Sequence, residues 1–110
     1  MTSFIEVPQI TFSGQETLPI YVNVADIVSI AQDYDGGTVL NVRELGSEGC
    51  AKFKSYLPIG LYLDQLGELA RFPGVRSWSD STKNAYLVPA QERAQKARAA
   101  ERQAVRSGQI

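Results

Sequence analysis

The chain has 110 residues, 44% hydrophobic and 21% charged, which is the composition of an ordinary globular protein and excludes global disorder. Its net charge of −1 excludes long-range attraction of the whole chain to nucleic acid or to an anionic membrane. The absence of histidine excludes a Ser-His-Asp triad. The single cysteine, Cys50, excludes an internal disulfide and a metal site built from several cysteines.

The charge is unevenly distributed along the chain. Residues 1–89 carry six basic and ten acidic side chains, a charge of −4, whereas residues 90–110 carry five basic and two acidic side chains, a charge of +3. The sequence therefore predicts an acidic body followed by a basic tail.

The first part of the chain reads as short β-strands. Residues 4–7 and 10–12 are β-prone pieces on either side of Pro8, and proline in such a run indicates an edge strand. A third strand is expected at 20–23, followed by a helical turn or tight corner and a fourth strand at 27–31.

Two turns then predict a β-meander. The sequence Asp-Tyr-Asp-Gly-Gly at 33–37 lies between two β-branched runs, and these glycines tolerate the positive φ angles of a hairpin turn. The partner strand is expected at 38–43, and a second glycine-containing turn at 46–49 leads to a strand at 50–54.

Helical patterns dominate the second part. Pro58 suits a first helical turn, and apolar residues at spacings of three and four predict an amphipathic helix that ends at 72–74. The serine-rich residues 75–83 read as an ordered loop or short hairpin, and 86–88 as a return to the sheet. From Pro89 to about Arg106, nearly every residue favours helix.

Together these elements predict an α+β fold. We expect a bent antiparallel β-meander of five or six strands, which is either an open sheet or an SH3-like, barrel-like one. One amphipathic helix packs on this sheet, and a C-terminal helix projects from it. The predicted organisation is a β-rich core with the packed helix at 1–71, a serine-rich loop and short strand at 72–88, and a basic Ala/Arg-rich helix at 89–110.

A family resemblance rests on the predicted strands. The sequence YVNVADIVSI at 21–30, with TVL at 38–40 and a helix ending in Leu66, resembles the small bacterial FlbD-like family, which is linked to flagella and motility. It is also similar to uncharacterised bacterial and phage proteins with the pattern V-N-x-x-x-I-x-x-I … G-T-x-[VIL], and more distantly to half of a LytTR-type DNA-binding domain. The resemblance covers residues 20–70 and implies a small curved sheet with a packed helix and no catalytic residue.

The sequence offers few groups for catalysis or for metal binding. Asp33 and Asp35 share one turn, but the calcium-loop pattern requires a glycine at its sixth position, where this chain has Thr38. Cys50 has no histidine to activate it, and Lys52 is the nearest cation. We therefore expect a non-enzymatic protein with no catalytic, metal or cofactor site.

Two kinds of partner follow from the remaining side chains. The leading hypothesis is a protein partner or a second copy, bound by the C-terminal helix and by the loop around Trp78, which supplies an aromatic anchor. Its residues are Phe72, Trp78, Ala90, Ala94, Ala97, Arg98, Arg102 and Arg106.

The alternative is nucleic acid, because basic side chains beside an exposed aromatic can bind a phosphate backbone. Its residues are Lys52, Lys54, Tyr56, Arg98, Arg102 and Arg106. The lysines and Tyr56 are expected to share one strand face. No stretch approaches the roughly 18 apolar residues of a membrane span, so we expect no membrane partner and a location in the cytoplasm or a phage particle.

Overall fold

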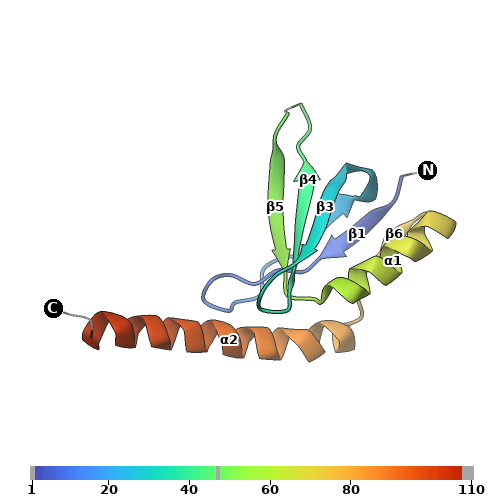
Figure 1. Cartoon of the computed structure of the whole chain (residues 1–110). Helices are drawn as coiled ribbons and strands as arrows, with labels where there is room; N and C mark the ends of the chain where they lie inside the picture. The colour runs from blue at the N-terminus through green and yellow to red at the C-terminus, as the bar shows by residue number, and fades with distance from the viewer. Residues whose placement is uncertain (1, 47, 108–110) are drawn as a thin grey trace.

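The computed structural model describes residues 2–46 and 48–107, with side chains as far as residue 103. It confirms the predicted α+β class, and its six strands form two three-stranded sheets, where the sequence predicts one continuous bent sheet. The elements in chain order (Figure 1) are β1 (Phe4–Val7), β2 (Ile20–Asn23), the 3-10 turn η1 (Val24–Asp26), β3 (Ile27–Gln32), β4 (Thr38–Arg43), β5 (Cys50–Ser55), α1 (Ile59–Arg71), β6 (Val75–Arg76) and α2 (Asp80–Ser107).

The sheet of β3, β4 and β5 is the predicted antiparallel meander. The β3–β4 turn closes through hydrogen bonds between Asp33 and Gly37 and between Gly36 and Asp33. Gly36 has a φ of 91°, which a side chain would disfavour. In the β4–β5 hairpin the amide of Glu44 donates to the carbonyl of Gly49. The local turn chemistry thus produces both hairpins where the sequence predicts them.

The other sheet has the order β2–β1–β6. β2 pairs antiparallel with β1, and the two-residue strand β6 pairs with β1 in parallel. The prediction that this strand lies at an edge is therefore wrong. β1 ends at Val7, so Pro8 lies outside the paired residues and does not interrupt the hydrogen bonds. The piece at 10–12 contributes only an isolated bridge between Ile10 and Glu16.

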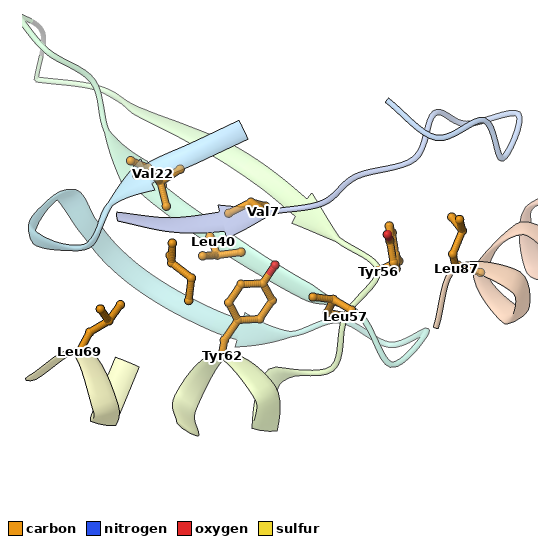
Figure 2. Packing of buried hydrophobic residues seen from close by; sticks show 11 residues of the cluster. Val7, Val22, Leu40, Tyr56, Leu57, Tyr62, Leu69 and Leu87 are labelled. Carbon is orange, nitrogen blue, oxygen red and sulfur yellow. The ribbon is translucent and has the colours of Figure 1, made fainter. Parts of the chain in front are cut away.

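The hydrophobic core lies between the two sheets and α1, and Figure 2 shows its side chains. Leu40 of β4 and Ile5 of β1 are fully buried, as is Tyr62 of α1. The Tyr62 hydroxyl donates to Ser55 Oγ over 2.6 Å, and burial raises the pKa of this phenol. The helix is thus held to the end of β5 by an apolar ring and by a buried hydrogen bond.

The second helix differs from the sequence prediction in where it starts. α2 begins at Asp80, so residues 80–88, expected in a loop and a strand, are helical. The Ser79 hydroxyl accepts a hydrogen bond from the Thr82 amide at this end, as an N-cap does. Pro89, expected in the first turn, lies inside the helix. Burial of Leu87 and Ala90 against the body favours the continuous helix over a break at the proline.

Candidate functional site

The start of α2 is fixed to β1 by a buried carboxylate. Glu6 is 1% exposed, and its Oε2 accepts from Lys83 Nζ at 3.0 Å. Its Oε1 accepts from the Trp78 amide at 2.9 Å. The hydrogen bond to Glu6 raises the pKa of Lys83, so the ammonium stays charged. One buried carboxylate therefore orients both the loop before α2 and its first turn.

Trp78 belongs to this internal junction. Its indole Nε1 donates to the Glu6 carbonyl at 2.8 Å, and its ring packs edge-on against Tyr62, with 5.3 Å between the ring centroids. The side chain is partly buried, and its only polar atom is already hydrogen-bonded. The structure therefore places Trp78 inside the domain, contrary to the expectation of a partner-binding anchor.

From its second turn onward, α2 runs below the body and then past it. Figure 1 shows its red C-terminal end extending to the left beyond the rest of the molecule. Ala90 is buried and Ala94 is half-buried. A Cβ on Gly14 would lie 3.4 Å from the Ala94 Cβ, so the loop after β1 packs closely on this part of the helix. Ala97 is exposed, and it marks where the body stops covering the helix.

A groove of about 450 Å³ opens beside this exposed part of α2. Its walls come from the helix, from the loop after β1, from the β3–β4 turn and from the end of β5. The lining residues are Ile10, Thr11, Phe12, Tyr34, Asp35, Gly37, Lys54, Tyr56, Ala90, Arg93, Ala94 and Ala97. We call this the α2 groove.

Two aromatic side chains on its rim are exposed. Tyr34 is 98% exposed and Phe12 is 74% exposed. Leaving two neighbouring aromatic rings in water forgoes the stabilisation that their burial would give. Large exposed apolar side chains gathered at one groove are typical of surfaces that bind another molecule.

An ion cluster forms one wall of the α2 groove. Lys54 Nζ lies 3.0 Å from Asp33 Oδ2 and also contacts Asp35. Burial opposes ionisation of Asp35, but hydrogen bonds from Lys54 and from the Gly37 amide outweigh it and hold its pKa below the usual value. Burial likewise opposes the charge on Lys54, yet hydrogen bonds to both aspartates keep its pKa raised. The charge of Lys54 in β5 is therefore compensated by the two aspartates of the β3–β4 turn.

Tyr56 lines the α2 groove, and its hydroxyl is buried beneath the surface. Its side chain is 5% exposed, and its hydroxyl is buried with no hydrogen-bond partner. Burial, with smaller effects from Glu16 and Glu6, raises the pKa of Tyr56 to about 12. The phenol is therefore a neutral donor at neutral pH. A buried donor without a partner costs free energy of folding.

The structure separates the residues predicted to bind nucleic acid. Lys52 is exposed on the outer face of β5, but Lys54 is paired with two aspartates. Tyr56 does not share their face, because β5 ends at Ser55 and the chain bends there and buries the ring. Arg98 and Arg102 lie on α2, the first half-buried and the second exposed. The Arg106 side chain lies outside the described part of the structure.

The residues predicted to bind a protein are also divided. Ala90, Ala94 and Ala97 line the α2 groove as one helical stripe. Phe72 is 62% exposed, but it follows the last turn of α1, on the other side of the molecule from the C-terminal end of α2 (Figure 1). It therefore belongs to a different surface.

Sequence reasoning missed Phe12, Tyr34 and Arg93 as neighbours of the alanine stripe. Phe12 reads as a strand residue and Tyr34 as part of a turn, and only the packing of α2 brings them together. An aromatic residue inside an Asp-Gly turn was the one available signal, because such a position exposes its side chain.

Comparisons with known proteins leave the family open. The chain matches no family model, and neither the curated proteins nor the solved structures give a significant match. Within residues 2–46 and 48–107, no helix is long and apolar enough to cross a membrane. The same described residues contain no cluster of three or more side chains suited to holding a metal ion.

Proposed function

We propose that this protein is a non-catalytic interaction module that docks another protein against the α2 groove and the exposed part of α2. The observation that carries the proposal is that exposed Phe12 and Tyr34 line the same groove as the Ala97 side of the helix. Alanines allow a partner backbone to approach closely, and aromatic side chains supply contact area.

The exposed end of α2 supports the same proposal. About ten residues of helix follow Ala97, and an isolated helix of that length is marginal in water. A bound partner would stabilise this segment. Because residues 20–70 resemble the FlbD-like family, we propose that the partner belongs to a bacterial or phage assembly. This assembly would lie in the cytoplasm or in a phage particle.

Nucleic acid is the weaker candidate. Its supporting observation is the exposed Arg102 beside Arg98 on a tail of charge +3. Lys54 and Tyr56 are withdrawn from that surface by the ion cluster and by burial. A steep fall of binding with added salt would favour this alternative.

Site-specific photo-cross-linking tests the proposal. Tyr34 and Leu45 are both 98% exposed, but Tyr34 lies in the α2 groove and Leu45 lies in the β4–β5 turn at the opposite end of the sheet (Figure 1). A photoreactive phenylalanine at position 34 should cross-link to protein in the native cells, whereas the matched probe at position 45 should not. Absence of any protein adduct at position 34, or equal adducts at both positions, would overturn the proposal.

A further inference from the structure

The α2 groove has one charged side chain without a counter-charge. Arg93 lines the groove and is exposed. Lys54 lines it too, but its charge is compensated by Asp33 and Asp35. Arg93 forms no ion pair with the residues that the structure describes, and it acts on Asp35 only through longer-range attraction. The Arg93 guanidinium is therefore available to a carboxylate from outside the chain.

The helix itself does not supply that carboxylate. Side chains three or four residues from Arg93 could reach it, and these positions hold Pro89, Ala90, Lys96 and Ala97. Glu92 directly precedes Arg93, and adjacent residues on a helix do not face each other. Glu101 is eight residues away, which is about 12 Å along the helix at 1.5 Å per residue.

The charge around the groove favours an anionic occupant over a cationic one. Residues 90–103 of α2 carry four basic and two acidic side chains. The acidic residues Glu44 and Glu48 of the body lie around the β4–β5 turn, at the opposite end of the sheet (Figure 1). A locally basic surface attracts acidic segments and raises their rate of association.

The walls of the α2 groove offer apolar contacts next to this charge. The Tyr34 amide donates to Asp33 Oδ1 at 2.8 Å, and Lys54 Nζ lies 5.8 Å from the centroid of the Tyr34 ring. The ring is thus positioned by its own turn, yet it remains 98% exposed. The α2 wall consists of small alanine side chains beside Arg93. An occupant that fits both walls carries a large apolar side chain for Tyr34 and a carboxylate for Arg93.

We infer that the occupant of the α2 groove is an acidic, amphipathic segment of a partner protein. Its apolar side chains cover Tyr34 and Phe12, and its carboxylate binds Arg93. The inference rests on the proposed function and names the chemistry of the partner. Nucleic acid fits less well, because a phosphate backbone needs several converging cations. Among the described residues that line the groove, Arg93 is the one uncompensated cation, and Asp35 repels phosphate.

Selection of random linear peptides on the immobilised full chain tests the inference. Peptides that bind the groove should lose affinity with Tyr34→Ala but not with Leu45→Ala, because both side chains are 98% exposed and only Tyr34 lines the groove. Among these peptides, acidic and large apolar residues should be enriched over the starting library. A groove-binding set without an excess of acidic residues would overturn the inference, as would a selection that yields no groove-binding peptide.

Charge reversal then locates the contact. Arg93→Glu should weaken binding of the selected acidic peptides about 10-fold in fluorescence anisotropy. Arg71→Glu makes the same charge change at an exposed position on α1, outside the groove, and should leave their affinity unchanged. Peptides with lysine in place of their acidic residues should bind Arg93→Glu more tightly than the wild type. Equal losses for the two variants, or no such reversal, would contradict a carboxylate at Arg93.

A competition experiment separates the two anionic classes of partner. A single-stranded oligothymidylate should fail to displace a selected acidic peptide at equal concentration, and displacement would overturn the inference. The proposed function is decided separately, because a photo-cross-link from position 34 reports any docked protein, whatever its charge. If that cross-link forms while the selected peptides show no acidic excess, only the inference about the partner's chemistry is lost.

Discussion

Glu6 and Lys83, 77 positions apart in the sequence, form an ion pair of 3.0 Å that joins the central strand β1 to the first turn of α2. The Glu6 side chain is almost fully buried, and the Lys83 side chain is 18% exposed. The position of the long helix relative to the sheets therefore depends on a charge in the interior.

Replacing Glu6 with glutamine should destabilise the protein, because Lys83 is left partly buried without a counter-charge. We expect the free energy of unfolding to fall by about 2 to 3 kcal/mol, less than for a fully buried pair. Urea denaturation followed by Trp78 fluorescence measures it, since Trp78 lies in the same junction. Glu44→Gln, at an exposed site, should change stability by less than about 0.5 kcal/mol. Equal unfolding midpoints for the two variants would contradict the role of the ion pair.

The ion cluster of the β3–β4 turn predicts a loss of stability in acid. The pKa of Asp35 is lowered in the fold from 3.8, so its stabilising contribution is present above that value and disappears as the pH falls through the folded-state pKa. When the pH is lowered from about 6 to 3, the free energy of unfolding should fall less for Asp35→Asn than for the wild type. The two decreases should differ by at most about 1 kcal/mol, because the ion pair is partly exposed. Urea titrations at the two pH values test this, and parallel losses would refute it.

Two buried tyrosines should respond oppositely to loss of their hydroxyl groups. Tyr56→Phe removes an unpaired buried hydroxyl and should leave the monomer equally stable or up to about 1 kcal/mol more stable. Tyr62→Phe loses the hydrogen bond to Ser55 and should cost about 1 to 2 kcal/mol. Thermal unfolding in dilute solution compares them, and a larger loss for Tyr56→Phe than for Tyr62→Phe would be inconsistent with the geometry.

Two glycines offer a matched test of packing. A Cβ on Gly37 would lie 2.6 Å from the Ser55 carbonyl oxygen, so Gly37→Ala should force the β3–β4 turn away from β5 and cost about 2 kcal/mol. Gly67 is in α1 with open space around it, and Gly67→Ala should stabilise the protein by about 0.5 to 1 kcal/mol. Chemical denaturation of both variants should give midpoint shifts of opposite sign; shifts of the same sign would count against this packing.

Much of the fold follows from local sequence signals. The Asp-Gly-Gly turn and the apolar spacing before Leu69 produce elements whose energetics are mainly local, and both are present as predicted. β6 was missed because two residues have no periodicity and pair only through contact with β1. The start of α2 was misplaced because the Ser79 cap and the burial of Leu87 outweigh the break expected at Pro89.

The candidate site was only partly predictable. The alanine stripe is visible from helical spacing alone. Strand alternation assigned Tyr56 to the same face as Lys54, but the bend after Ser55 reverses that assignment. The placing of Phe12 and Tyr34 beside the alanine stripe depends on how α2 crosses the body, which no local pattern encodes.

The position of β1 has a consequence for synthesis of the protein. β1 leaves the ribosome before the other five described strands, yet one of its two neighbours, β6, follows at Val75–Arg76, and the counter-ion of Glu6 follows at Lys83. The meander of β3, β4 and β5 can pair as soon as it emerges, and β2 can pair with one edge of β1. The other edge of β1 and the Glu6 carboxylate must stay in water until β6 and Lys83 have been made. The domain therefore closes late in translation, and a nascent chain arrested before Lys83 exposes a strand edge open to pairing with other chains.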